Sequence, residues 1–415
     1  MEPVAPSKAH LGRNVRLLFA TRIIRLFAYG LMSVILVLHL AASGLTESQV
    51  GLLLTLTLLG DAAISLFITT RADRMGRRRM LLVGALLMIA AGVVFASTQS
   101  FALLLLAATV GVISPSGNEV GPFLAVEQAA LSQAIPAQRR TAVFAWYNLV
   151  GSFATALGSL CGGALAEILQ RRGQAPIKSY HTVAMAYSLV AVGMVALFAQ
   201  LGRDVEADHG RVTESKPAGL WGMKTSRDKV LGLAGLFSID AFAGGFVVQA
   251  FVAYWFHQRF GVSPSVLGEI FFAANMLAGI SALSASRLAK RIGLLETMVA
   301  THLPSNLLLL LVPLMPNLGL AIVVLLLRFS ISQMDVPTRQ AYTMALVPPA
   351  ERSAAAGVTG IARTLGAAIS PIAAGPLYAS AGLASIPFFI GGGLKVVYDL
   401  LIWRSFRRVK IDTGK

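Results

Sequence analysis

The sequence has little charge and almost no cysteine. Only 13% of its 415 residues are charged, acidic residues number 19 against 35 Lys and Arg, and Cys161 is the one cysteine. A single cysteine cannot form an intramolecular disulfide, so no disulfide framework holds this fold. The scarcity of charge, together with 56% hydrophobic residues, excludes an ordinary soluble globular protein.

The sequence contains many long apolar runs. Twelve segments long enough to span a membrane can be drawn along the chain. They cover roughly residues 16–41, 47–70, 80–98, 101–134, 141–169, 181–201, 230–257, 265–286, 294–315, 317–346, 354–380 and 383–403. The sequence therefore predicts an all-α integral membrane protein with twelve transmembrane helices.

The basic residues are distributed unequally between the two sides of these segments. With both termini placed in the cytoplasm, the outer loops contain only Arg171, Arg172, Lys178 and Arg259. Basic residues concentrate on the cytoplasmic side of membrane proteins, so this topology is favoured. The net charge of +16 is then an orientation signal, and nucleic acid is not an expected partner. Residues 1–15 contain no signal-peptide core, so we expect the first span to act as its own insertion signal.

Two of the apolar segments place a proline within three residues of a carboxylate. The stretch 111–128 includes Pro122 and Glu119, and residues 330–343 repeat its pattern with Pro337 and Asp335. Proline interrupts helical hydrogen bonding, and a buried carboxylate must face protein or water rather than lipid. The copies lie about half the chain apart. They predict two similar six-helix halves, 1–201 and 230–415, joined by a polar cytoplasmic linker at 202–229.

A short polar loop between the second and third segments carries a specific motif. Residues 69–80 read TTRADRMGRRRM, and a degenerate copy, SRLAKRIG, occupies residues 286–293. The first loop is similar to the pattern Gly-x-x-x-Asp-Arg-x-Gly-Arg-Arg, with a threonine in place of the leading glycine. The matching residues are Asp73, Arg74, Gly76, Arg77 and Arg78. With this loop, the segment count and the half-repeat, the chain resembles the major facilitator superfamily.

The resemblance implies a fold and a mode of action. It implies two pseudo-symmetric six-helix bundles around a central cavity, opened alternately to the two sides of the membrane. It also implies that Asp73 latches the halves on the cytoplasmic side, near the eleventh span, which begins just after Arg352. The absence of a Walker-type phosphate loop leaves direct drive by ATP without support.

Carboxylates within the spans are the candidates for binding protons or substrate. Asp61 stands near the middle of the second span, Glu119 in the fourth and Asp240 in the seventh, where Gln249 accompanies it. Burial disfavours the charged form of a carboxylate, which suits it to proton exchange. A structural hydrogen bond between helices is the alternative for Asp61. For Glu127, near the cytoplasmic end of the fourth span, the alternative is a solvated interfacial position.

Arginines within the spans leave several interpretations open. Arg22 is expected to be an interfacial anchor, whereas Arg25 either does the same or faces the cavity. In the cavity, Arg25 would pair with an acidic residue or bind an anionic substrate. Asp335 and Arg339 are spaced i, i+4, which predicts a salt bridge that is either structural or part of a gate. Arg328 stands where the family often has an arginine in the corresponding span of the first half.

These residues predict a secondary transporter that couples a small-molecule substrate to the proton gradient, with no cofactor or metal. Export of a drug-like or toxic compound in exchange for protons is the first hypothesis. It is favoured by the Phe- and Met-bearing spans and by Gly158–Gly163, which resembles the end of the family's antiporter motif. Uptake of a metabolite or organic anion together with protons is the alternative.

A membrane sensor or an intramembrane enzyme is disfavoured. A sensor would need a soluble output domain, and no polar segment is long enough to fold as one. An enzyme would need clustered catalytic residues, whereas the six histidines are scattered and mostly near span ends. We expect a multi-pass monomer in the lipid bilayer of a bacterial-style inner membrane or plasma membrane.

Overall fold

The computed structural model describes residues 8–118, 121–202, 205–206, 226–348 and 351–409. Glu119 lies outside these residues. The described part consists of α-helices, short 3-10 segments and connections, with no strand. Ten of its helical stretches are long and apolar enough to cross a membrane. The predicted all-α membrane fold is confirmed, while the number of twelve spans and the cytoplasmic position of the termini stay predictions.

The chain divides into two compact units, each of which is described by itself. The first unit comprises Met1–Thr46, Leu56–Val212 and Val262–Phe272, and the second comprises Glu47–Thr55, Thr213–Gly261 and Ala273–Lys415. Two long helices, α2 (Glu47–Met75) and α10 (Pro264–Ile292), therefore contribute residues to both units.

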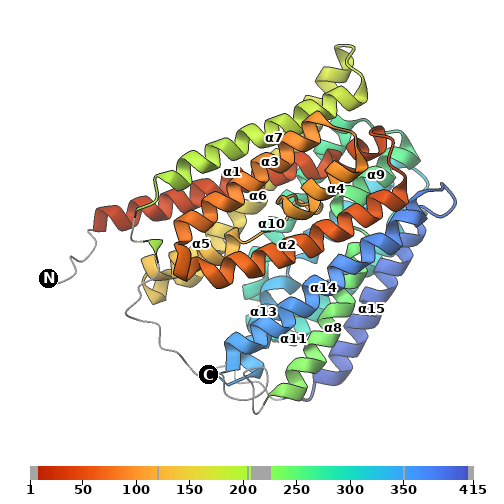
Figure 1. The fold of residues 1–415 in the computed structure, drawn as a ribbon. Helices are drawn as coiled ribbons and strands as arrows, with labels where there is room; N and C mark the ends of the chain where they lie inside the picture. Colours follow the sequence, from red (N-terminus) through yellow and green to blue (C-terminus); the bar gives the residue numbers. More distant parts are fainter. Residues whose placement is uncertain (1–7, 119–120, 203–204, 207–225, 349–350, 410–415) are drawn as a thin grey trace. The chain divides into compact units, whose positions relative to one another are not determined.

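The first unit is built around three helices that run side by side. They are α1 (Lys8–Ala42), α6 (Ala137–Arg171) and α7 (Pro176–Ala199), and α7 also packs on α3 (Arg77–Ser97) (Figure 1). Glycines bring α1 and α6 together. A Cβ atom at Gly158 or Gly162 would overlap backbone atoms of Phe27 or Leu31. Small residues of α6 thus permit close contact between the two helices.

The fourth apolar segment is interrupted, as its prolines predict. Helix α4 (Phe101–Val110) ends well before α5 (Phe123–Ala134) begins. Within the interruption Gly117 has φ +70° and Gly121 has φ +81°, a region that favours glycine. The hydroxyl of Thr155 donates to the carbonyl of Gly117 over 3.1 Å, and the hydroxyl of Tyr187 donates to the carbonyl of Val112. These side chains satisfy backbone groups that a broken helix leaves unpaired in a membrane.

The second unit repeats the interruption. Its helices are α8 (Arg227–Gly245), α9 (Gln249–Phe260), α11 (Leu294–Leu311), the 3-10 helix η3 (Val312–Leu314), α12 (Leu318–Ser332), α13 (Asp335–Leu346), α14 (Arg352–Tyr378) and α15 (Ile386–Phe406). The expected break near Pro337 falls between α12 and α13. Another separates α8 from α9 after Gly244 and Gly245.

An apolar core fixes α8 among its neighbours. Phe237 of α8 packs in one buried cluster with Met298 of α11, Tyr342 of α13 and Tyr398 of α15. Helix α14 comes equally close, because a Cβ atom at Gly366 would overlap the carbonyl of Ser238. Helices α8, α14 and α15 accordingly lie side by side (Figure 1). Asp240, three residues after Phe237 on α8, is therefore within reach of four other helices.

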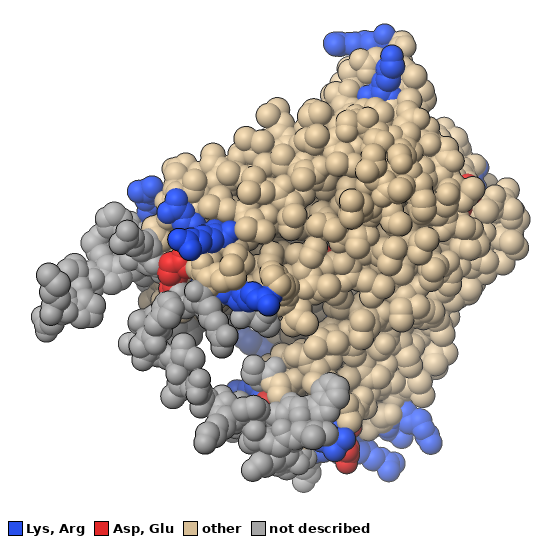
Figure 2. Space-filling view, in the orientation of Figure 1, with Lys and Arg blue, Asp and Glu red and all other residues tan. Residues whose placement is uncertain are grey.

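The surface is suited to a bilayer. Large aliphatic side chains are exposed along the helices, including Leu66 at 59%, Leu106 at 61% and Leu189 at 70%. On the face shown in Figure 2, Lys, Arg, Asp and Glu are few, and other residues cover most of the surface. Such exposed apolar area is unfavourable in water and favourable against lipid tails.

Candidate functional site

Asp240 of α8 is the centre of a buried charge cluster. Its side chain is 4% exposed, and its Oδ1 accepts from Lys395 Nζ at 2.5 Å. Its Oδ2 accepts from Arg339 Nη1 at 3.0 Å and from Arg363 Nη1 at 3.2 Å. The Nε2 atom of His302 lies 3.5 Å from Oδ1. The partners come from α15, α13, α14 and α11, so one carboxylate joins five helices.

Because this cluster is buried, its ion pairs are needed to offset the cost of removing the charges from water. An isolated charge costs several kcal/mol in a dry interior, and only close opposite charges and hydrogen bonds offset that cost. Asp240 satisfies this condition with three cations, and Lys395 also donates to its backbone carbonyl at 3.2 Å. Removing the negative charge of Asp240 would leave those cations without their common partner.

The i, i+4 pair predicted on α13 is present and belongs to the same cluster. Arg339 Nη1 lies 3.0 Å from Asp335 Oδ2 while also contacting Asp240, and its guanidinium lies 5.6 Å from the ring centre of Phe237. Both members of the pair are buried. Arg352 lies elsewhere: it is exposed at the start of α14, where its Nε donates to the carbonyl of Met344 at 3.1 Å.

Arg328 of α12 adds a further positive charge nearby. It interacts electrostatically with Asp335 and Asp240, and its guanidinium lies 5.1 Å from the ring centre of Phe329. Its Nε is buried and has no hydrogen-bond acceptor among the described residues.

Four residues of this site, Lys395, Arg363, His302 and Asp399, were not anticipated from the sequence. His302 Nδ1 lies 2.8 Å from Asp399 Oδ1, and Asn306 Nδ2 donates to Asp399 Oδ2 at 2.9 Å. His302 therefore stands between two carboxylates, Asp240 on α8 and Asp399 on α15. A signal was available: Lys395 and Asp399 stand four residues apart in an otherwise apolar span, and so share one helix face.

The first unit contains a second buried ion pair. Arg25 of α1 donates through Nη1 and Nη2 to the two carboxylate oxygens of Glu127 in α5, each at 2.7 Å. Thr21 donates to the same carboxylate at 3.0 Å, and the hydroxyl of Tyr147 also donates to it. Arg25 and Glu127 are both 0% exposed. The solvated position considered for Glu127 is wrong, since the interruption before α5 turns this face inward.

The interfacial position expected for Arg22 is also wrong. Its side chain is buried, with Nε donating to the carbonyl of Tyr147 at 2.7 Å and Nη2 to Asn148 Oδ1 at 3.1 Å. Its guanidinium lies 4.3 Å from the ring centre of Tyr147. The arginines of α1 thus fix α6 and α5, and Arg25 pairs with an acidic residue, which was one of its open interpretations.

The remaining sequence candidates are placed as follows. Asp61 is half-buried in α2, beside Gly60. A Cβ atom added at Gly60 would overlap the carbonyl of Thr109 in α4. Gln249 opens α9 and accepts from Asn275 Nδ2 at 3.2 Å. The functional roles expected for Asp61 and Gln249 stay predictions.

The loop motif binds a residue of the linker. Gly76 has φ +100°, and Glu206 accepts from the backbone N–H of Arg77 at 2.5 Å and of Arg78 at 3.3 Å. Arg77 Nη1 also donates to Gln133 Oε1 at 2.8 Å. A carboxylate is favoured at the N-terminus of a helix, here α3. The side chains of Asp73 and Arg74 lie outside the described residues, so the latch expected at Asp73 stays a prediction.

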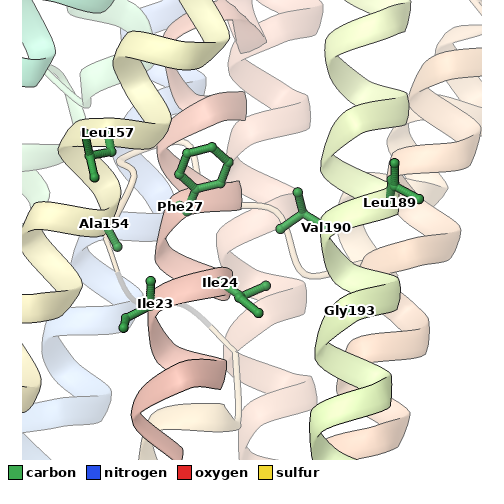
Figure 3. Close-up of a pocket in the computed structure, with 8 residues that line it drawn as sticks. All are labelled: Ile23, Ile24, Phe27, Ala154, Leu157, Leu189, Val190 and Gly193. Carbon is green, nitrogen blue, oxygen red and sulfur yellow. The ribbon is translucent and has the colours of Figure 1, made fainter.

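The first unit also contains an apolar groove. It has a volume of about 320 Å³ and is formed by α1, α6 and α7. Figure 3 shows its lining residues, which carry no charge: Ile23, Ile24, Phe27, Ala154, Leu157, Leu189, Val190 and Gly193. Since no ionisable group lines it, the groove is not where protons would bind.

Comparison with known proteins gives a consistent family. A model described as Major Facilitator Superfamily matches residues 18–371. The chain is 30% identical over 431 residues to the Saccharomyces cerevisiae "Uncharacterized membrane protein YJR124C", covering 97% of this chain and 96% of the yeast protein. It is 24% identical over 161 residues to "Quinolone resistance protein NorA" of Staphylococcus aureus, which covers 39% of this chain and 40% of NorA.

Solved structures share the fold at low sequence identity. A bacterial homologue of the human lysosomal transporter Spinster, in an inward-facing and occupied conformation, has a TM-score of 0.77 at 14% identity, covering 98% of this chain and 99% of that one. The D-xylose-proton symporter has a TM-score of 0.71 at 16% identity, with 98% and 99% covered. The protein is thus a multi-pass membrane protein with a transporter fold.

Proposed function

Because the chain belongs to the Major Facilitator Superfamily, we propose that it is a secondary active transporter in which Asp240 couples the movement of a small molecule to protons. The observation that supports this proposal most is that the buried Asp240 carboxylate contacts four side chains. They are Lys395, Arg339, Arg363 and His302. A proton on Asp240 would weaken the contacts that hold α13, α14 and α15 to α8. Proton binding and helix arrangement are then linked, as alternating access requires.

His302 is suited to carry the proton. An imidazole can accept a proton at one nitrogen while donating a proton from the other. Its two nitrogens face Asp240 and Asp399 at 3.5 and 2.8 Å. We assign Asp399 and His302 to one proton path that ends at Asp240. In this proposal the proton gradient supplies the energy and no cofactor is required. We propose that the protein acts as a monomer in the bilayer.

The sense of coupling has two candidates. Export of a drug-like or toxic compound in exchange for protons is supported by the partial similarity to NorA, whose name is quinolone resistance protein. Uptake together with protons is supported by the cluster itself. Protonated Asp240 would free three cations to bind an anion that enters with the proton.

The test is transport by the purified protein in proteoliposomes with an imposed pH gradient. A pool of metabolites and toxic compounds is added, and mass spectrometry identifies those that cross. Movement outward as protons enter supports exchange, and movement inward with protons supports co-transport. Transport that is unaffected by both the pH gradient and Asp240→Asn would contradict proton coupling.

A matched control is available on the surface of the first unit. Glu167 pairs with Arg171 at 2.8 Å, and the Arg171 side chain is 76% exposed. Glu167→Gln therefore removes a paired carboxylate from a span without touching the Asp240 cluster. Its coupling is expected to equal that of the unchanged protein.

A further inference from the structure

The cluster around Asp240 has more positive than negative charge. Two carboxylates, Asp240 and Asp335, lie among four basic side chains, three of which contact Asp240 directly, and the third carboxylate, Asp399, is hydrogen-bonded by His302 and Asn306. The cations are Lys395, Arg339, Arg363 and Arg328. An uncompensated buried charge is costly, so such a surplus is retained where an anion completes it.

One of these cations is placed to receive a ligand. The Arg363 side chain is 34% exposed, whereas those of Lys395 and Arg339 are 10% and 8% exposed. Among the described residues, its guanidinium makes one hydrogen bond, from Nη1 to Asp240 Oδ2 at 3.2 Å. A guanidinium has five N–H donors and binds planar anionic groups through two of them. Arg363 therefore keeps donors available on an accessible side.

Arg328 supplies the second observation. Its Nε is buried without an acceptor in the described part of the chain. A buried donor left unsatisfied is destabilising, and a bound acceptor removes that cost. Arg328 also raises the positive potential at the cluster, since its own electrostatic partners, Asp335 and Asp240, are shared with Arg339.

We propose that the substrate is a small organic anion, and that Arg363 binds its carboxylate, sulfonate or phosphate group with Arg328 as the supporting cation. This inference deepens the proposed function and rests on it for the transport step, but the binding itself does not require proton coupling. A cationic compound is disfavoured at this site, because it would have to approach four positive charges. Among the two senses of coupling, an anionic substrate favours co-transport with the proton.

The test is thermal stabilisation of the full chain in detergent by paired probes. Benzoate, hexanoate and benzenesulfonate are compared with benzamide, hexanamide and benzenesulfonamide, which keep the skeleton and remove the charge. We expect at least one anion to raise Tm while its uncharged partner does not. No stabilisation by any of the anions, or equal stabilisation by the uncharged partners, would overturn the proposal.

Variants separate a binding residue from a structural one. Arg363→Gln is expected to weaken the binding of the stabilising anion roughly tenfold to a hundredfold, the range for a charge-assisted contact. Arg363→Lys should keep the preference for anions with weaker binding, and Arg171→Gln, on the exposed side of the first unit, should bind normally. Retention of full affinity in Arg363→Gln would also overturn the proposal.

Failure of the proposed function gives a different result. Asp240→Asn removes the competing carboxylate, so anion binding should be retained or strengthened even though coupling to protons is lost. Anion binding without any pH-driven transport would contradict proton coupling and leave this inference standing. Loss of anion binding in Asp240→Asn, in a protein that still unfolds cooperatively, would contradict the inference.

Discussion

Arg25 and Glu127 form a two-pronged ion pair, with both N–O distances at 2.7 Å and neither side chain exposed. This pair connects α1 to α5, the helix that follows the interruption of the fourth apolar segment. Because Thr21 and Tyr147 also donate to Glu127, the carboxylate is satisfied on both oxygens. It is therefore a structural anchor of the first unit.

Removal of one partner of this pair should be strongly destabilising. Glu127→Gln leaves the Arg25 guanidinium buried without a counter-charge, which costs about 3–5 kcal/mol. Thermal unfolding in detergent measures the effect. Glu167→Gln is the control and should cost less than about 1 kcal/mol, because the Arg171 side chain that it leaves unpaired is 76% exposed and stays hydrated. A double replacement of Arg25 and Glu127 by leucine should recover much of the loss, and equal loss in the single and double variants would contradict this account.

Asp240→Asn should abolish proton-driven transport while the protein still inserts and folds. Asparagine has the shape of aspartate but cannot take up the proton, so the contacts with Lys395 and Arg339 no longer depend on protonation. We expect pH-driven flux to fall by about a hundredfold or more, the scale of a lost proton-transfer group. Exchange of labelled substrate without a gradient should persist, and its loss together with the driven flux would indicate a different defect.

His302→Gln and Asp399→Asn should act on one step. Both interrupt the proposed path, since His302 lies between Asp399 and Asp240. Each single variant is expected to slow pH-driven transport, and the double variant should be little slower than the worse single one. Groups in one network are non-additive in this way. Multiplication of the two effects in initial-rate measurements would place the residues in separate steps.

Gly375→Ala should destabilise the second unit. A Cβ atom at Gly375 would overlap the carbonyl of Glu47 and press on Gly51 at the start of α2. Overpacking of this kind costs about 1–3 kcal/mol. Gly360→Ala is the matched control on the same helix, because nothing lies within 4 Å of its Cβ position. It should be neutral or stabilising by up to about 1 kcal/mol. Thermal unfolding compares the two, and an equal response would refute close packing as the cause.

Glu206→Gln should weaken the start of α3. Glu206 accepts from the N–H groups of Arg77 and Arg78, and its negative charge suits a helix N-terminus. We expect a loss of about 0.5–2 kcal/mol, the range for helix caps. Hydrogen exchange of the first turn of α3 measures it directly. Unchanged exchange there would show that the linker contact contributes nothing to the helix.

The helices and their interruptions could be predicted because their causes are local. Apolar length gives the spans, and Pro122 and Pro337 each stand beside an observed interruption. Asp240 was identified as a buried acid by its position in an apolar run. These inferences use residues close together in sequence, for which periodicity and backbone chemistry decide the outcome.

The partners of those residues could not be predicted. Arg25 meets Glu127 across 102 positions, and His302 meets Asp399 across 97. Nothing local specifies such contacts, since they depend on how the helices pack. Glu127 was misjudged for the same reason: depth along an ideal helix says nothing of the turn made between α4 and α5. The spacing of Lys395 and Asp399 was the one local sign of the missed site.

The five helices that meet at Asp240 also constrain how this protein can evolve. Loss of any single partner leaves a buried charge unmatched and lowers stability, so most one-step replacements at this cluster are disfavoured even where the protein still folds. We therefore expect the charged residues of this cluster to be kept together or replaced together. Adaptation to a new substrate is easiest at Arg363, which is partly exposed and holds Asp240 by one contact. Substrate specificity can then change through Arg363 while the contacts of Asp240 with Lys395 and Arg339 are kept.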